Sequence, residues 1–344
     1  MLQEVFRIPG LDIPIFGYGL MMVIGFLCSV QLQKFLARRC GLDPEVFVNA
    51  ALIALVAGVV GSRISHVLEN LPDYTRADRT LLQNLWAMVN IRSGGLTFYG
   101  GLILAFPIVI WYGIRKGVPI PRGMDIVAPA ITMGLAFGRI GCFLNGCCYG
   151  AECQLPWAVE FPYYSSAYAE QYDRGEIAPP KELLVADGRT LPDAAQRMPR
   201  PRLVTPQELR QGYAMRTVID PFGGAAVRER VELDPAAKQI AAQQHALRLH
   251  PAQLYSAFNS FLITAILVAF FTMNPAPGRV MALMLMLEGA TRFLLEMVRA
   301  EPPVLGRMSI SMIIAVFLVI GGIIMWFAFG ERRGDSAGAH LAAA

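Results

Sequence analysis

The chain has 344 residues, of which 55% are hydrophobic and only 16% are charged, and its formal net charge is +4. Its mean hydropathy of +0.45 is too high for an ordinary soluble domain. These values indicate an integral membrane protein, and we expect no nucleic-acid partner.

Seven apolar stretches each approach the roughly 20 residues that a bilayer-spanning helix needs. The first is preceded by acidic residues and prolines and is followed by no small-residue cleavage site, so we do not interpret it as a cleavable signal. The sequence therefore predicts an all-α polytopic membrane protein of seven transmembrane helices. They are expected near residues 13–35, 46–68, 96–114, 124–145, 252–273, 279–298 and 308–329.

Lysine and arginine concentrate after the first, third, fifth and seventh stretches. By the positive-inside rule these four sites face the cytoplasm, which predicts an outside N-terminus and a cytoplasmic C-terminus. The residues are Lys34, Arg38, Arg39, Arg115, Lys116, Arg122, Arg279, Arg332 and Arg333.

A long charged segment between the fourth and fifth stretches predicts an extracytoplasmic insertion. Its middle, about 175–245, has weak patterning and is expected to be partly disordered, whereas LPWAVEFPYYSSAYAEQY suggests an ordered element. The expected organisation is 1–145 with four spans and an outer arm at 69–95, 146–251 as the head segment, 252–330 with three spans, and 331–344 as a cytoplasmic tail.

Ionisable residues inside predicted spans are costly and are candidates for function. The second span holds Arg63 and His66, and His66 is either an interfacial histidine or a base with a pKa near neutrality. The third span opens with RSGGLTFYGGLI, whose Gly100 and Gly101 follow Tyr99. Paired glycines at a helix start suit an anion or ligand site.

The fourth span carries a permanent charge, Arg139, within GLAFGRIGCFLNGCCYG. It is either a snorkelling interfacial arginine or, with Arg292 of the sixth span, a clamp for a lipid phosphate. In the sixth span Glu288, Arg292 and Glu296 are four residues apart and share one helix face. They form either a self-neutralising ladder or the wall of a polar cavity.

Four of the six cysteines lie within twelve residues, at Cys142, Cys147, Cys148 and Cys153. The spacing lacks a C-x-x-C pair, so the zinc signal is weak. A disulfide that includes Cys153 and buried free thiols are both open alternatives.

Five motifs in order resemble those of the bacterial prolipoprotein diacylglyceryl transferase family over nearly the whole chain. Three positions depart from the family pattern: Cys142 stands for asparagine, Cys147 for glutamate, and Tyr99 for histidine. The motifs are GYGLMMVIGF (17–26), GGLTFYGG (94–101), GRIGCFLNGCCYG (138–150), HPAQLY (250–255) and ATRFLLEMVR (290–299).

The resemblance implies an enzyme that moves a diacylglyceryl group from phosphatidylglycerol to the lipobox cysteine thiol of preprolipoproteins, with release of glycerol phosphate. It implies a monomer in the bacterial cell inner membrane, whose partners are phosphatidylglycerol, signal peptides and membrane lipids, with no metal or soluble cofactor. Tyr99, Arg139 and Arg292 are the expected catalytic residues, and His66 is the alternative base. Substrate contacts are expected from Arg139, Tyr18, Gly100, Gly101, Asn145, Gly150, His250 and Glu296.

Two other functions remain open on the residues alone. A transporter of an anionic solute would also need intramembrane arginines, although the sequence shows no repeat of the kind that such folds contain. A membrane thiol-redox protein would use the cysteines between 142 and 153.

Overall fold

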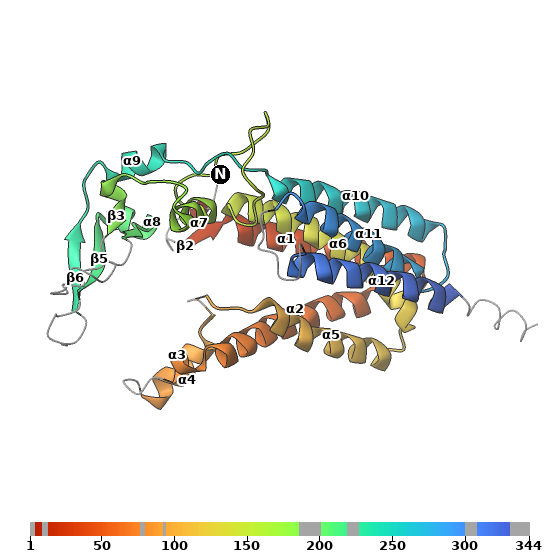
Figure 1. Cartoon of the computed structure of the whole chain (residues 1–344). Helices are drawn as coiled ribbons and strands as arrows, with labels where there is room; N and C mark the ends of the chain where they lie inside the picture. The colour runs from red at the N-terminus through yellow and green to blue at the C-terminus, as the bar shows by residue number, and fades with distance from the viewer. Residues whose placement is uncertain are drawn as a thin grey trace, which may run out of the picture. The chain divides into compact units, whose positions relative to one another are not determined.

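The computed structural model (Figure 1) describes residues 4–8, 13–75, 80–91, 94–185, 201–218, 227–299 and 308–330. The predicted tail at 331–344 lies outside these residues. A long helix forms at each of the seven predicted stretches. The helices are α1 (Gly17–Arg39), α2 (Pro44–Glu69), α5 (Phe98–Arg115), α6 (Ile120–Asn145), α10 (Ala252–Thr272), α11 (Arg279–Glu296) and α12 (Ile310–Gly330).

Five of these helices, α1, α2, α6, α10 and α12, are long and apolar enough to cross a membrane. Helix α5 is apolar but slightly shorter, and α11 contains two glutamates and two arginines. Large apolar side chains point away from the protein, such as Ile103, which is 74% exposed, and Phe317, which is 68% exposed. Such surfaces are stable against lipid rather than water.

The fold is mostly helical, but the prediction of an all-helical chain is wrong in detail. Three antiparallel two-stranded sheets lie in the described part of the chain. They are β1 (Glu4–Ile8) with β2 (Ile13–Phe16), β3 (Leu184–Val185) with β4 (Arg202–Leu203), and β5 (Tyr213–Val218) with β6 (Val227–Glu232). The shorter helices are α3 (Leu71–Tyr74), α4 (Leu81–Val89), α7 (Ser166–Arg174), η2 (Lys181–Leu183), α8 (Pro206–Gln211) and α9 (Ala237–Gln243).

The chain divides into two compact units, which we describe separately. The head unit comprises Met1–Met22, Gly138–Ala257 and Leu294–Pro303, and the helix unit comprises Val23–Phe137, Phe258–Phe293 and Val304–Ala344. The division cuts through α1, α6, α10 and α11, so it does not coincide with the predicted domain boundaries.

The helix unit has an apolar core, and a buried carboxylate lies beside it at the start of α11. The core includes Leu36, Ile126 and Leu267, all nearly inaccessible to solvent. Asp125 is fully buried and accepts hydrogen bonds from the backbone N–H groups of Gly278, Val280 and Met281, at 2.7, 3.0 and 3.0 Å. It therefore caps the N-terminus of α11, where free N–H groups and the helix dipole favour a negative charge.

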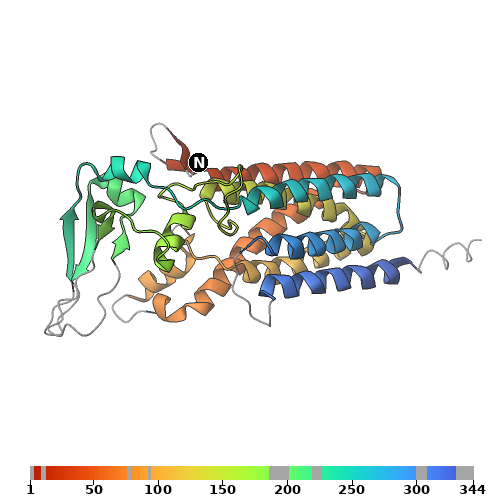
Figure 2. The same ribbon diagram turned by 45° about the horizontal axis from the view of Figure 1, so that its top comes forward.

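The outer arm of the helix unit is held by a second buried charge. Arg63, 6% exposed on α2, donates to five backbone carbonyls within residues 87–95. Helices α2 and α5 pack side by side (Figures 1 and 2). All five N–H groups of the Arg63 guanidinium therefore have acceptors, and the charge in the second span has a structural role.

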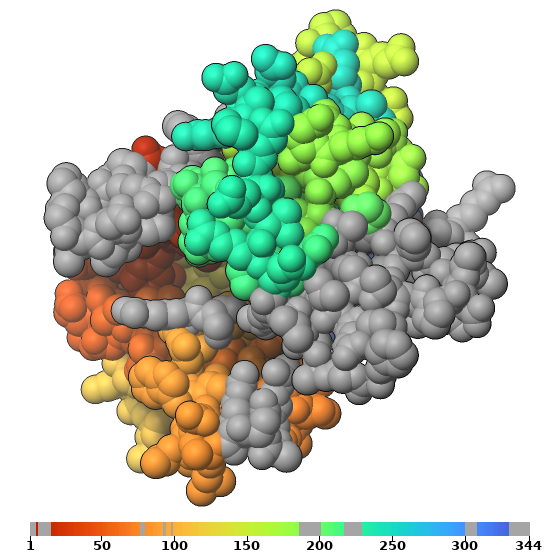
Figure 3. Space-filling model, turned by 90° about the vertical axis from the view of Figure 1, so that its left-hand side faces the viewer, coloured from red at the N-terminus to blue at the C-terminus, as the bar shows by residue number. Residues whose placement is uncertain are grey.

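The head unit has its own hydrophobic core, so it is more than a linker. Phe161, Tyr163 and Tyr168 are at most 3% exposed and pack with residues from η2, α8, α9 and β5. Figure 3 shows the described residues of this region, lime to teal, as one continuous surface. The expected order in LPWAVEFPYYSSAYAEQY is confirmed by α7 and these tyrosines. Partial disorder in the middle stays a prediction, because 186–200 and 219–226 lie outside the described residues.

Candidate functional site

The candidate site of the head unit forms where α6 ends and the chain turns back. Gly146, with φ +73°, terminates the helix, and its N–H donates to the carbonyl of Phe143. Two residues later Cys148 also has a left-handed backbone, with φ 60°. Such a conformation is uncommon for a residue other than glycine and tends to occur at functional sites.

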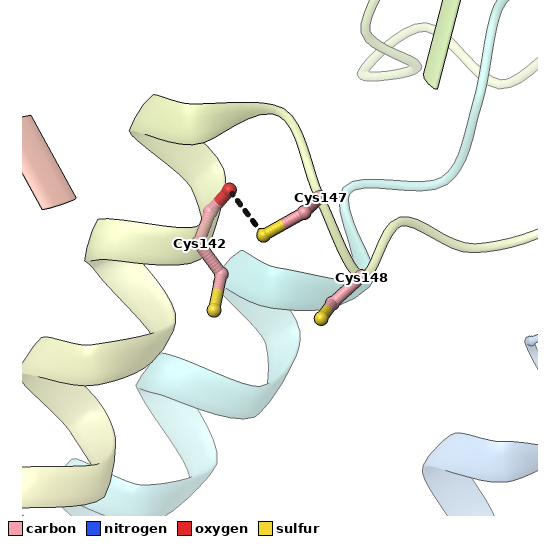
Figure 4. Close-up of side chains that lie close together, drawn as sticks. All are labelled: Cys142, Cys147 and Cys148. Carbon is pink, nitrogen blue, oxygen red and sulfur yellow. Dashed lines mark hydrogen bonds between the residues drawn. The ribbon is translucent and has the colours of Figure 1, made fainter. Parts of the chain in front are cut away.

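This turn brings three thiols together. The Sγ atoms of Cys142, Cys147 and Cys148 all lie within 4.8 Å of one another (Figure 4). The Cys147 thiol donates to the Cys142 carbonyl at 3.7 Å. Hydrogen bonds from the Cys142 and Cys147 thiols, and then the positive charges of Arg139 and Arg299, lower the pKa of Cys148.

The alternative of a disulfide that includes Cys153 is wrong. All six cysteines are free, and Cys153 is a buried thiol whose backbone N–H donates to the Arg248 carbonyl at 3.0 Å. It lies outside the cluster of three because the chain between Gly150 and Cys153 pairs with residues 248–250 instead.

A polar cavity of about 440 Å³ adjoins the thiols. Cys147, Cys148, Gly150 and Arg299 contribute to its walls, and α7 contributes further charged residues. This volume falls in the range of small-molecule sites. Arg299 lies 3.7 Å from the buried carboxylate of Glu296, which is 4% exposed.

Arg299 was missed as a site residue by the sequence reasoning. It ends the ATRFLLEMVR motif one turn after Glu296, so its position was visible in the sequence as a continuation of the charged helix face. Only the fold shows that this arginine, rather than Arg292, lines the cavity of the head unit.

Gly150 and His250, which belong to two different motifs, lie together. The N–H of Gly150 donates to the carbonyl of His250 at 2.9 Å, and a Cβ on Gly150 would come within 2.7 Å of the His250 Cβ. The His250 ring lies 3.3 Å from the hydroxyl of Tyr255. Glycine is therefore required here for a close approach of two backbones.

Arg139, Tyr18 and Asn145 also belong to the head unit. Arg139 of α6 is half-buried and lies within electrostatic range of Tyr18 of α1. The ring of Tyr18 packs against Gly141, which is also in α6. Asn145 is the last residue of α6, directly before the thiol turn. The head unit thus combines Arg139, Arg299, a cluster of three thiols and a polar cavity.

The remaining predicted residues lie in the helix unit, and several have structural partners. A Cβ on Gly100 would overlap Ser65, and one on Gly101 would overlap Ser62, so both glycines serve the packing of α5 on α2. Tyr99, by contrast, is 60% exposed.

His66 packs beneath the arm that Arg63 holds. Its backbone carbonyl accepts from the Asn70 side chain at 2.9 Å, and its ring lies edge-on to Tyr74. Gly95, with φ +81°, lies so close that a Cβ would overlap the His66 ring. These contacts favour the interpretation of His66 as a packed interfacial histidine.

The charged residues of α11 contact polar groups in both units. In the helix unit Arg292 donates to the Ser311 hydroxyl at 3.2 Å, and Glu288 accepts from Ser260 at 3.5 Å. Glu296 pairs with Arg299 in the head unit. These contacts hold polar groups of α11 in place in each unit.

Apolar helices of membrane-spanning length define a multi-pass membrane protein, and a polar cavity walled by thiols and charged side chains lies at the end of one of them. The model of the prolipoprotein diacylglyceryl transferase family matches residues 3–328, so the chain belongs to that family.

Several curated relatives are named phosphatidylglycerol–prolipoprotein diacylglyceryl transferase. The chain is 32% identical to the protein of Rhodopirellula baltica over 65% of this chain and 45% of that protein. It is 22% identical to the Clostridium tetani protein over 95% and 97% of the two chains, and 26% identical to the Serratia proteamaculans protein over 92% and 89%. The matches to the Rhodopirellula and Corynebacterium diphtheriae proteins span about half of those relatives.

Proposed function

We propose that this protein transfers the diacylglyceryl group of phosphatidylglycerol to the lipobox cysteine thiol of preprolipoproteins. A thioether C–S bond forms, the C–O bond to phosphate breaks, and the electron pair leaves on the phosphate oxygen of glycerol phosphate. The thiol proton passes to a base. The observation that supports this reaction best is the polar cavity of the head unit, with Arg299 in its wall and Arg139 near its thiols.

The cavity wall carries three glutamates, Glu152, Glu170 and Glu176, and two arginines, Arg174 and Arg299, and it is the arginines that suit the leaving group. A departing phosphate monoester gains negative charge, which fixed guanidinium groups stabilise in the transition state. We assign this role to Arg139 and Arg299. We also assign substrate contacts to Tyr18, Asn145, Gly150, His250 and Glu296, which belong to the same unit; among them Gly150 lines the cavity.

We also propose roles for residues of the helix unit. Tyr99 and Arg292 would be catalytic, and Gly100 and Gly101 would contact substrate. His66 would be the alternative base. We further propose seven spans, with the N-terminus outside the cytoplasm and the C-terminus inside, in the bacterial inner membrane. The position of the basic residues supports this orientation. Cysteine accessibility labelling from each side of the membrane would test it.

Complementation tests the activity directly. The gene for this chain is expressed in a strain depleted of its own diacylglyceryl transferase, and the mass of a reporter lipoprotein is measured. We expect the mass increase of one diacylglyceryl group, and no such increase with Arg139→Ala. Arg216→Ala, which removes an exposed charge paired with Glu229 in the head, is the matched control. An unmodified lipoprotein beside well-expressed wild-type protein would contradict the proposal.

A further inference from the structure

The three clustered thiols form a preorganised set of metal ligands. Cys142 comes from the last turn of α6, and Cys147 and Cys148 come from the turn that follows (Figure 4). Their sulfur atoms lie within 4.8 Å of one another, close enough for one ion to contact all three. All three side chains are only half-buried.

Backbone contacts keep this arrangement in place without any metal. The N–H of Cys147 donates to the Cys142 carbonyl at 3.1 Å. The fully buried amide of Gln253 donates to the Cys147 carbonyl at 2.8 Å. A Cβ at Gly146 would collide with Ser165, so the turn depends on glycine at that position. Ligands fixed in this way bind a metal without first having to be ordered.

The ligand set selects the class of metal. Thiolates are soft ligands that favour Zn²⁺ and Cu⁺ over Mg²⁺ or Ca²⁺. Three protein ligands around Zn²⁺ leave a fourth tetrahedral position for water or substrate, as in catalytic rather than structural zinc sites. Three thiolates and Zn²⁺ sum to one negative charge, which Arg139 and Arg299 offset because both lie within electrostatic range of Cys148.

The open position has a route to substrate. Cys147 and Cys148 line the 440 Å³ cavity together with Arg299. A thiol that coordinates Zn²⁺ loses its proton, and thiolate is the nucleophilic form of cysteine. A substrate thiol bound at this position would be activated next to the charge that stabilises a leaving phosphate.

We propose that Cys142, Cys147 and Cys148 bind one Zn²⁺ ion whose fourth position accepts the acceptor cysteine thiol as a thiolate. The second half of this proposal rests on the proposed function, and the first half does not. Metal binding releases to solvent whatever protons the three thiols still carry, and ligation of the substrate thiol releases one more. No electron is transferred to or from the metal. The proposal departs from the expectation that no metal is needed.

Co²⁺ titration of the purified full chain in detergent tests the metal site, since Co²⁺ in a thiolate site absorbs in the near ultraviolet and visible ranges. We expect one equivalent to bind with thiolate charge-transfer bands and to be displaced by Zn²⁺. Cys142→Ser, Cys147→Ser and Cys148→Ser should each weaken binding by more than the roughly 10- to 100-fold typical of losing an outer-shell partner. Cys153→Ser, from the same unit but outside the cluster, should bind as the wild type does. Binding without thiolate bands, or equal loss in Cys153→Ser, would overturn the site.

A second measurement needs no substitution. In wild-type protein Zn²⁺ should protect Cys142, Cys147 and Cys148 from maleimide, as read by peptide mass spectrometry, and should leave labelling of Cys28 and Cys40 unchanged. Equal labelling of the cluster with and without Zn²⁺ overturns the proposal.

The thiol position is tested on the Co²⁺ protein. A lipobox peptide with cysteine should shift the visible bands, and the same peptide with serine should not. Unchanged bands with the cysteine peptide overturn the activation role. Failure of the proposed function would be recognised separately, as an unmodified lipoprotein in the complementing strain while Co²⁺ still binds.

Discussion

At the scale of residues, four arginines in or next to the predicted spans have different surroundings. Arg63 is enclosed by five carbonyls and has no capacity left for a ligand. Arg292 contacts Ser311, Arg299 lines a cavity, and Arg139 is half-buried near the thiols. In the sequence all four look alike, as intramembrane or interfacial charges. Their contacts in the fold distinguish the structural role of Arg63 from the proposed chemical roles of the others.

Arg139→Ala is expected to lower transfer at least 100-fold, because a missing oxyanion donor typically costs about 2.7–4 kcal/mol in the transition state. Arg139→Lys should also be poor, since lysine cannot bind phosphate with a bidentate fork. The rate of thioether formation on a lipobox peptide measures the effect. Wild-type rates in a well-expressed Arg139→Ala protein would eliminate the role in headgroup binding.

The base is a separate question at the same scale. Tyr99 is exposed, whereas His66 is packed against Gly95. We expect Tyr99→Phe to lose most of the transfer activity, Tyr99→His to retain part of it, and His66→Gln to remain active unless the arm loosens. Peptide lipidation followed by mass spectrometry gives the three rates.

An active Tyr99→Phe protein beside an inactive but folded His66→Gln protein would move the assignment to His66. If both variants are active, neither side chain is the base. Deprotonation of the substrate thiol would then be explained by the proposed metal site or by the positive charges of Arg139 and Arg299.

At the scale of elements, the arm and helix α11 are both positioned by a buried charge and backbone groups rather than by apolar packing alone. Asp125 joins α6 to the N-terminus of α11, and Arg63 joins α2 to residues 87–95. Close contacts at Gly100 and Gly101 bring α5 against α2. Inside a bilayer, where the hydrophobic effect does not drive helices together, such polar and small-residue contacts determine packing.

Arg63→Met should release the arm, because the five carbonyls would lose their donor and would have to reach water. Unsatisfied buried groups cost about 1–3 kcal/mol each, so opening of the arm limits the total loss to about 2–4 kcal/mol. Hydrogen–deuterium exchange should rise in residues 87–97 and remain unchanged in the head. Arg38→Met, at an exposed position, serves as the control. Unchanged exchange in the arm would show that other contacts hold it.

At the scale of the whole molecule, the chain forms two compact units, and the head has a core of its own. Part of its stability comes from one ion pair. Arg202 donates to Glu208 at 2.6 Å, and Thr205 completes a capping box with the same carboxylate. The hydrogen bond from Arg202 lowers the pKa of Glu208 to about 2.

Because the folded pKa of Glu208 lies below the usual value of 4.5, its stabilisation is present above about pH 4.5 and is lost as the pH falls toward about 2. After allowance for solvent screening we expect about 1–2 kcal/mol. Glu208→Gln should therefore raise amide exchange in residues 202–216 at neutral pH, to the level that the wild type reaches in acid.

Glu229→Gln is the matched control, since Glu229 pairs with Arg216 at 2.7 Å but is 52% exposed. It should change the local stability by less than about 0.5 kcal/mol. If the two variants change the local stability equally, the burial of the ion pair of Glu208 with Arg202 adds nothing to that stability.

The sequence by itself located the seven long helices, because largely apolar runs of this length favour a helix, and five of the runs are long and apolar enough to cross a bilayer. It also determined the family, through motifs in the observed order. It identified the aromatic segment of the head as ordered, whereas the contact of Gly150 with His250 came from the structure.

The tertiary structure alone decided the roles of individual polar residues. Cys153 follows Cys148 closely in sequence but pairs its backbone with Arg248, while Cys142, Cys147 and Cys148 converge around a turn that Gln253 holds from 106 positions away. The structural role of Arg63 is visible only from its hydrogen bonds to the backbone of the arm. Helix formation depends on local periodicity, whereas these assignments depend on hydrogen-bond partners distant in the chain, which no local pattern specifies.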